Sequence, residues 1–258
     1  MKDTVTEFYQ ELAPHYDQMT RFQARFKSEE KVLREWIKRY EFKSVLDVAC
    51  GTGLHAIILS TLGIRSVGSD ISPDMLKHAR HNAAQADVKV RWVSASMQEV
   101  SQKVSQKFDA IFCLGNSLPH LLTIGDLHKT VQGLSNLLND SGILVLQMLN
   151  YDQLLKSKKR IVGINREKNR KFIRFYDFLE NLIQFNILTI DWEDNVPTSQ
   201  LTSTLLHPYT KGELNTTLAH FGFRDIEYYG DLKFSEYRPI GSPNLVIVAR
   251  KNSKHDQR

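Results

Sequence analysis

The chain has 258 residues, with 34 Lys and Arg against 29 Asp and Glu, which gives a formal net charge of +5. Hydrophobic residues make up 41% and charged residues 24%, so disordered and collagen-like classes are excluded. No apolar run reaches the ~20 residues of a membrane-spanning helix, and no signal-peptide core is present, so we expect no membrane partner. Cys50 and Cys113 are too few for a disulfide framework or a metal-ligand cluster. We therefore expect no metal and a cytoplasmic location.

Residues 28–150 alternate strand and helix patterns. A helix is expected from Ser28, where acidic residues occupy the first turn, to about Tyr40. Strands are expected at 44–49, 65–70, 88–93, 108–113 and 143–149, with helices at 54–62, from Ser72 and at about 126–138, and a turn at 139–142. Strands separated by helices pair in parallel through right-handed crossovers. The pattern therefore predicts an α/β, doubly wound sheet that binds ligands at the carboxyl ends of its strands.

The pattern changes after Asn150. Strand patterns at 172–178, 181–192 and 201–206 follow one another without helices, which predicts an antiparallel lid inserted after the fifth strand. A capping box at Thr210 and Glu213 opens a helix that ends at Gly222. Two closing strands, at 224–230 and 244–250, bring the mostly parallel main sheet to seven strands. The expected divisions are an N-terminal cap (1–27), a core (28–150), an antiparallel lid or substrate subdomain (151–209), the C-terminal part of the core (210–250) and a disordered tail (251–258).

A glycine-containing loop lies between the first predicted strand and its helix. Gly51-x-Gly53-x-x-Ala56 matches a dinucleotide-binding fingerprint, and Asp70 ends the next strand at a suitable distance. The match alone fits NAD, FAD or another adenosyl ligand. Asp47, at the entry to the loop, would oppose a pyrophosphate, whereas S-adenosylmethionine lacks phosphate and carries an ammonium and a sulfonium. This charge favours S-adenosylmethionine, although Asp47 could instead brace the loop or cap the helix.

Residues 45–53 (VLDVACGTG) resemble motif I of the class I S-adenosylmethionine-dependent methyltransferases. Residues 114–120 (LGNSLPH), 150–152 (NYD), 230–231 (GD) and 237–239 (YRP) are similar to segments of the glycine N-methyltransferase-like branch. The pattern Tyr9, Ala13, Tyr16 and Asp17 resembles the N-terminal cap of many small-molecule members. The resemblance implies a Rossmann-like fold and S-adenosyl-L-methionine as cofactor, with S-adenosyl-L-homocysteine as product.

The resemblance also implies site residues. Asp70 is expected at the ribose and residues 95–97 at the adenine, within a cofactor set of Asp47, Ala49, Gly51, Gly53, Asp70, Ile71, Met75, Ser96, Met97 and Leu114. The expected substrate contacts are Tyr16, Asn116, Leu149, Tyr151, Tyr176, His207 and Tyr209. His120 and Tyr237 are the candidate catalytic residues, because His120 follows the fourth strand and tyrosine side chains stabilise cationic groups. For His120 and Asn116, bracing or capping of the local loop is the alternative.

The sequence departs from the glycine N-methyltransferase pattern at a position that contacts the methyl acceptor. Glycine N-methyltransferases carry an arginine just before Asn-Tyr-Asp that binds the substrate carboxylate, and here Leu149 stands at that position. Leucine cannot replace a bidentate guanidinium, so glycine is not implied unless Arg174 or Arg238 reaches the site. We expect in-line methyl transfer to a small molecule, most naturally at an amine nitrogen.

Other functions stay open from the sequence. The methyl acceptor could be an oxygen, sulfur or carbon atom, or the protein could bind the cofactor without catalysis. RNA could be methylated with the help of the basic stretch 156–174, although a solvated loop is the simpler interpretation, so nucleic acid is not the expected partner. A homo-oligomer is compatible with the sequence.

Overall fold

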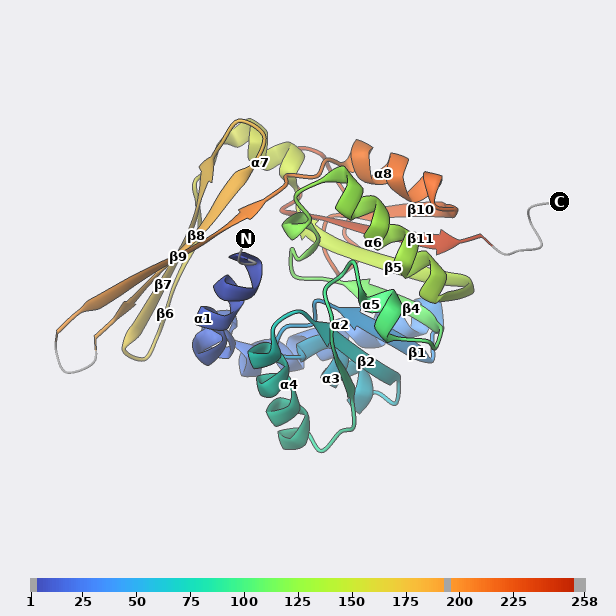
Figure 1. Cartoon of the computed structure of the whole chain (residues 1–258), viewed down its shortest axis with the longest axis horizontal. Coiled ribbons are helices and arrows are strands. Elements are labelled where there is room, and N and C mark those ends of the chain that lie inside the picture. The colour runs from blue at the N-terminus through green and yellow to red at the C-terminus, as the bar shows by residue number, and fades with distance from the viewer. Residues whose placement is uncertain (1–3, 193–195, 253–258) are drawn as a thin grey trace.

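Two β-sheets organise the chain, and the computed structural model describes residues 4–192 and 196–252 of it (Figure 1). The larger sheet has seven strands in the order β10-β11-β5-β4-β1-β2-β3. Its strands are β1 (Ser44–Val48), β2 (Arg65–Asp70), β3 (Arg91–Ser94), β4 (Phe108–Cys113), β5 (Leu138–Leu149), β10 (Phe223–Tyr229) and β11 (Asn244–Lys251). The five strands from β3 to β5 are parallel, and β11 and β10 close the sheet antiparallel. The predicted Rossmann-like, mostly parallel seven-stranded sheet is therefore confirmed.

Helices cover both faces of this sheet. They are α1 (Thr4–Thr20), α2 (Phe22–Tyr40), α3 (Leu54–Thr61), α4 (Pro73–Gln85), α5 (Val100–Lys103), the short 3-10 helix η1 (Leu118–His120), α6 (Ile124–Leu137), α7 (Tyr151–Ser157) and α8 (Lys211–His220). The Ser72 side chain caps α4 by accepting from the Met75 N–H, and the predicted capping box of Thr210 and Glu213 opens α8. Among the described residues, no helix has the length and hydrophobicity that a bilayer crossing needs.

Three sequence-based boundaries were wrong. The helix expected from Ser28 begins at Phe22, because Arg21 takes a left-handed backbone conformation (φ 57) that separates α1 from α2, and Phe22 is buried in the core. The turn expected at 139–142 lies inside β5, where its pairing with β4 shifts register. Lys251, placed in the tail, belongs to β11, and its ammonium donates to the carbonyls of Ser135 and Leu138. Residues 253–258 lie outside the described part.

The central parallel strands β1 and β4 are almost entirely buried, which explains why their sequences are largely apolar. All five residues of β1 are buried. One hydrophobic cluster joins the sheet to α6 and α8, and includes Leu134, Leu146 and Leu218. The other joins the opposite face to α2 and α3, and includes Trp36 and Ile57. These two layers fix the strand ends from which the site residues extend.

The second sheet has four antiparallel strands in the order β6-β7-β8-β9 and follows β5 in the chain, as predicted. Its strands are β6 (Ile161–Glu167), β7 (Arg170–Phe178), β8 (Ile183–Asp191) and β9 (Thr198–Leu206). Strand β6 was missed, because residues 156–174 were interpreted as a basic loop. From Val162 to Glu167 the β6 side chains alternate between exposed and half-buried, but the exposed set includes Val162 and Ile164 beside Arg166. No alternation of apolar and polar residue types therefore marks this strand in the sequence.

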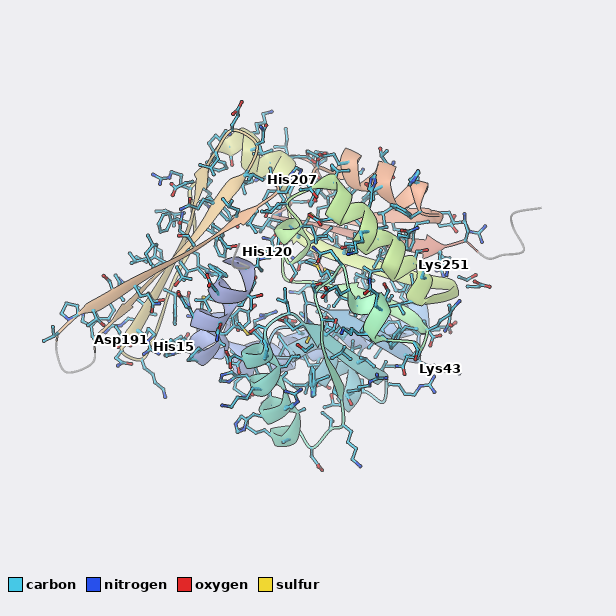
Figure 2. The ribbon with its side chains drawn as sticks, viewed as in Figure 1. His15, Lys43, His120, Asp191, His207 and Lys251 are labelled. Atoms are coloured by element: carbon cyan, nitrogen blue, oxygen red, sulfur yellow. The ribbon has the colours of Figure 1, made fainter. Side chains whose placement is uncertain are left out.

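Helix α1 lies between the antiparallel sheet and the main body of the molecule (Figure 1). Phe8, Leu12 and Met19 of α1 pack with Phe172 and Ile187 of the sheet. Polar contacts add to this packing: the Arg170 guanidinium bonds Asp191 and His15, and Figure 2 shows His15 and Asp191 side by side. The helix and the sheet therefore form one unit over the carboxyl ends of the parallel strands.

Candidate active site

A cavity of about 300 Å³ lies at the carboxyl ends of the parallel strands. The β1–α3 loop, the end of β2, the residues after β3, the η1 segment and α1 enclose it. Its lining residues are Val5, Tyr9, Tyr16, Ala49, Gly51, Asp70, Ile71, Ala95, Ser96, Met97, Gln98, Glu99, Ser117, His120 and Leu121. A smaller lobe of about 60 Å³ shares Tyr16, Ala49, Gly51 and Ser117 with it and adds Arg25, Asp47, His55 and Leu114, among others.

The loop after β1 is held open by backbone conformation and by Asp70. Ala49, Gly51 and Gly53 have positive φ angles of 55°, 56° and 88°, which turn the chain sharply after the strand. Asp70 accepts hydrogen bonds from the Gly51 N–H (2.8 Å) and the Ser72 N–H (2.9 Å). Burial raises the pKa of Asp70, and these N–H donors act in the opposite direction. Its carboxylate is therefore fixed at the cavity edge with lone pairs left for hydroxyl donors.

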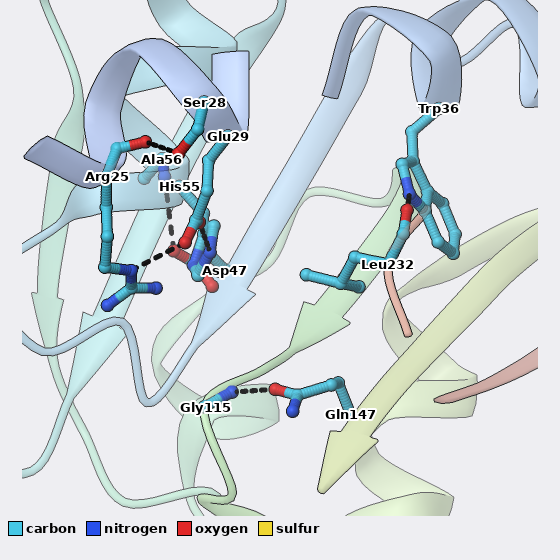
Figure 3. A network of polar contacts seen from close by, with 10 residues as sticks. All are labelled: Arg25, Ser28, Glu29, Trp36, Asp47, His55, Ala56, Gly115, Gln147 and Leu232. Carbon is cyan, nitrogen blue, oxygen red and sulfur yellow. Dashed lines mark hydrogen bonds and ion pairs between the residues drawn. The ribbon is translucent and has the colours of Figure 1, made fainter. Parts of the chain in front are cut away.

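A charged cluster surrounds the smaller lobe (Figure 3). Asp47 accepts from the Ala56 N–H (3.2 Å), and burial raises its pKa to about 6. Glu29 bonds both the Arg25 guanidinium (2.6 Å) and the His55 imidazole (2.5 Å). Burial of Glu29 opposes its ionisation, yet the bonds to His55 and Arg25 lower its pKa to about 2. The lobe thus combines fixed charges of both signs, which suits an amino-acid group carrying an ammonium and a carboxylate.

The opposite side of the large cavity carries hydroxyl and imidazole groups. The Tyr9 hydroxyl and the His120 Nε2 atom share a hydrogen bond of 2.8 Å, and Figure 2 shows His120 at the centre of the molecule. Nearby, the Asn116 side chain bonds the Tyr151 hydroxyl and accepts from the Leu149 N–H (3.0 Å). Burial raises the pKa values of Tyr9, Tyr16 and Tyr151, so all three phenols stay neutral near pH 7.

Several expected site residues lie outside the linings. Met75 is buried in the core, and Gly53 makes close contact with Trp92, so both act through packing. Tyr209 donates to the Leu121 and Thr123 carbonyls, and the His207 N–H donates to the Pro119 carbonyl, so both anchor the segment that carries His120. The Tyr237 hydroxyl donates to the Asn150 side chain (3.2 Å), and burial raises its pKa to about 12. Tyr237 lies outside both linings and supports the loop at Asn150, and its expected catalytic role stays a prediction.

Sequence reasoning missed Tyr9 and Arg25 as site residues. Tyr9 and Tyr16 are seven residues apart, which is two helical turns, so both lie on the face of α1 that meets the cavity. That spacing was a usable signal for Tyr9. No sequence pattern indicated Arg25, because it precedes the expected start of the helix that carries it.

The lining fits S-adenosylmethionine better than a dinucleotide. None of the described residues lining the large cavity is a lysine or arginine, whereas Asp70 and Glu99 are acidic. A pyrophosphate would lack a counter-charge there, while ribose hydroxyls could donate to Asp70. Tyr16 covers the glycine loop, with its ring 3.6 Å from the position of a Cβ at Gly51, and offers an aromatic surface for a cation.

Comparisons with known proteins agree with this fit. A family model described as a methyltransferase domain matches residues 45–142. The glycine/sarcosine N-methyltransferase of Parasynechococcus marenigrum (strain WH8102) is 35% identical over 259 residues, covering 97% of this chain and 86% of that protein. The glycine/sarcosine N-methyltransferase of Aphanothece halophytica is 30% identical over 253 residues, covering 95% of this chain and 90% of that protein.

A solved structure shows the same fold. An S-adenosylmethionine-dependent methyltransferase from Clostridium acetobutylicum ATCC 824 matches with a TM-score of 0.80 at 17% identity, covering 95% of this chain and 99% of that one. One family accounts for the two long sequence matches and for the match to the methyltransferase-domain family model, and the fold of this solved structure is consistent with it. The chain belongs to the glycine N-methyltransferase-like branch of the class I methyltransferases, and it is an S-adenosylmethionine-dependent enzyme.

Proposed function

We propose that this enzyme methylates an amine nitrogen of a small molecule. The observation that carries the proposal is the hydrogen-bonding acceptor side of the cavity, formed by the hydroxyl and imidazole groups of Tyr9, Tyr16 and His120. A neutral amine brings its own lone pair and needs only weak acceptors for its N–H groups. A hydroxyl acceptor would need a stronger base to remove its proton. The carboxylates in the lining, Asp70 and Glu99, already hold the β1–α3 loop and the Ser96 hydroxyl.

The chemistry is a single displacement. S-adenosylmethionine supplies an activated methyl group: the amine lone pair forms the new N–C bond while the S–C electron pair passes to sulfur, which leaves S-adenosylhomocysteine. His120 receives the proton that the methylated nitrogen releases. Because the Tyr9 hydroxyl can both donate and accept, its hydrogen bond to His120 persists whether or not the imidazole gains that proton. The protein contributes alignment and exclusion of water, which are large terms in such a reaction.

The cofactor residues follow from the two lobes. Asp70 would hold the ribose, and Ile71, Ser96 and Met97 would surround the adenine in the large lobe. The small lobe would take the amino-acid end, with Asp47 opposite its ammonium and Arg25 opposite its carboxylate. Ala49 and Gly51, which line both lobes, and Leu114 of the small lobe would complete the cofactor contacts.

The basic stretch favours a small molecule over RNA. Strand alternation splits its charges: Arg170 and Arg174 share a sheet face with Phe172, which packs on α1, while Arg166 and Lys171 pair on the other face. Two of its arginines therefore face α1 rather than solvent, which reduces the basic surface available to a phosphate backbone. The names of the two relatives above, which act on glycine and sarcosine, also support a small amine.

A panel assay tests the proposal. S-adenosylhomocysteine release would be measured with S-adenosylmethionine and equal concentrations of amines, phenols, alcohols, thiols and RNA. We expect release with one or more small amines. Release with a phenol, thiol or RNA but with no amine would contradict the proposal.

A further inference from the structure

Arg174 lies on the face of the antiparallel sheet that is turned toward the site. Its neighbours two residues away on β7, Phe172 and Tyr176, are both buried, and Phe172 packs against α1. Across the strands, Arg174 pairs with Gly163 of β6 and Ile187 of β8, and Ile187 is also buried in the cluster with α1. The register therefore directs the Arg174 side chain into the space between the sheet and α1.

The guanidinium of Arg174 occupies this space without an anionic partner. Its Nε atom is buried and makes no hydrogen bond, and no ion pair joins Arg174 to any other residue in the part of the chain that the structure describes. Gly163 makes room for the side chain, because a Cβ at that position would stand 2.8 Å from an Arg174 terminal nitrogen. By contrast, Arg170 on the same face is fully engaged with Asp191 and His15. A half-buried guanidinium with a free donor is costly unless an anion completes it.

The charge of Arg174 reaches the residues of the acceptor side. Burial raises the pKa of Tyr16, and Arg25 and Arg174 both act in the opposite direction. Burial likewise raises the pKa of Tyr176, and Arg174 is the charge that opposes it. Tyr16 lines both lobes of the cavity and also packs against the cluster that contains Phe172 and Ile187, the neighbours of Arg174 on the same sheet face. The large lobe itself has no Lys or Arg among its described lining residues.

We propose that Arg174 recognises the methyl acceptor by pairing with an anionic group on it, which we assign as a carboxylate. This inference rests on the proposed amine methylation. Leu149 cannot hold a charge, and its N–H is taken by Asn116. The planar fork of an arginine binds a carboxylate through two parallel hydrogen bonds, and the unsatisfied Nε of Arg174 is one arm of that fork. The acceptor would then extend from His120 toward the antiparallel sheet.

Two substitutions and one matched control test the assignment. R174Q removes the charge, and R174K keeps the charge but loses the fork. R166Q removes an arginine from the opposite face of the same sheet, where Arg166 bonds a backbone carbonyl and lies over Trp192. Binding of S-adenosylhomocysteine to each variant, measured by calorimetry, shows that the fold and the cofactor lobes are intact.

The kinetic readout compares glycine, methylamine and aminomethylphosphonate as acceptors. We expect the unmodified enzyme and R166Q to prefer glycine over methylamine. R174Q should raise KM for glycine about tenfold or more, the loss expected for a charged hydrogen bond, with methylamine turnover unchanged. The KM of R174K for glycine should lie between the values of R174Q and the unmodified enzyme. Equal glycine kinetics in R174Q and the unmodified enzyme would overturn the assignment, and a preference for the phosphonate would overturn the choice of carboxylate.

A binding readout separates this inference from the proposed function. Acetate is titrated into the protein loaded with S-adenosylhomocysteine, and we expect binding in the unmodified enzyme and R166Q that is lost in R174Q. Loss of acetate binding in R174Q with no amine turned over would reject the amine acceptor while upholding Arg174 as a carboxylate site. If the enzyme methylates amines but acetate binds equally well to R174Q and to the unmodified enzyme, Arg174 is not the carboxylate site and the proposed function still stands.

Discussion

The Tyr9 hydroxyl lies 2.8 Å from the Nε2 atom of His120, and this hydrogen bond joins the first helix to the segment after β4. Tyr9 is half-buried beside Phe8, whose ring contacts Phe185 of the antiparallel sheet, and the Tyr9 ring meets the His120 imidazole edge to face. The bond therefore links the unit that covers the cavity to the group that we propose as proton acceptor. The position of this unit and the orientation of His120 are therefore linked by this contact.

Replacing Tyr9 with phenylalanine should lower kcat. The ring and its packing stay, but His120 loses the hydroxyl that fixes its orientation, so we expect a fall on the order of tenfold or more. S-adenosylhomocysteine affinity should change little. Y228F is a matched control, because the Tyr228 hydroxyl bonds Asn215 at the surface. A Y9F enzyme with unchanged kcat would show that the contact does not serve catalysis.

Replacing Asp70 with asparagine should weaken cofactor binding. Asp70 accepts two backbone N–H bonds, and an amide would place a donor against one of them while removing the charge that we propose for the ribose. The expected loss is about 1–3 kcal/mol in S-adenosylhomocysteine binding, measured by calorimetry. D140N serves as control because Asp140 is exposed. Affinity equal to that of the unmodified enzyme would remove Asp70 from the cofactor site.

Asp47 should give the ligand-free protein a specific pH dependence of stability. Burial raises its pKa to about 6 in the folded chain, against about 3.9 when unfolded. At pH values between these two pKa values, Asp47 is protonated in the folded state and ionised in the unfolded state. The free energy of unfolding therefore falls as pH rises through this window and levels off above it. The loss is at most about 3 kcal/mol.

The D47N variant isolates this effect, because asparagine does not titrate and can still accept from the Ala56 N–H. Urea unfolding at pH 4, 5, 6 and 7 should show the unmodified chain losing stability relative to D47N as pH rises. A constant difference between the two proteins across this range would contradict the raised pKa.

Gly53, in the loop after β1, and Gly63, which follows α3, allow backbone strain to be separated from packing. Both have positive φ, 88° and 84°, yet a Cβ at Gly53 would stand 2.5 Å from Trp92, whereas a Cβ at Gly63 has open space. We expect G63A to lose roughly 1 kcal/mol of unfolding free energy from its backbone alone. G53A should lose roughly 1–3 kcal/mol more through overpacking, as measured by urea unfolding. Equal losses in the two variants would show that Trp92 moves aside without cost.

The sequence predicted the parts of the fold that local patterns encode. Continuous apolar strands, Ser72 before Pro73 and the Thr210–Glu213 capping box each carry their own signal, and the structure contains all of them. The β1–α3 loop could be placed at the carboxyl edge because parallel strands bring such loops together. Strand β6 was missed because its exposed face carries the apolar residues Val162 and Ile164, so the sequence shows no alternation of apolar and polar residues.

The candidate site was predictable mainly on the cofactor side, although Tyr16 and His120, which line the acceptor side, were also expected from the family resemblance. Asp47, Gly51 and Asp70 lie within one β-α-β unit, so their spacing in the sequence fixes their spacing in space. Tyr9, Arg25 and Arg174 come from helices and a strand far from that unit in the chain. Their placement depends on how α1 and the antiparallel sheet pack over the core, and no local pattern reports such packing.

The most direct test of the account uses S-adenosylmethionine with a ¹³C-labelled methyl group. The enzyme is incubated with a mixture of small amines, alcohols, phenols and thiols, and the product methyl carbon is observed by NMR, because its chemical shift depends on the atom to which it is bonded. The account predicts a methyl group on nitrogen, formed by the unmodified enzyme and reduced in Y9F. A label found only on oxygen, sulfur or carbon would contradict the proposed amine acceptor.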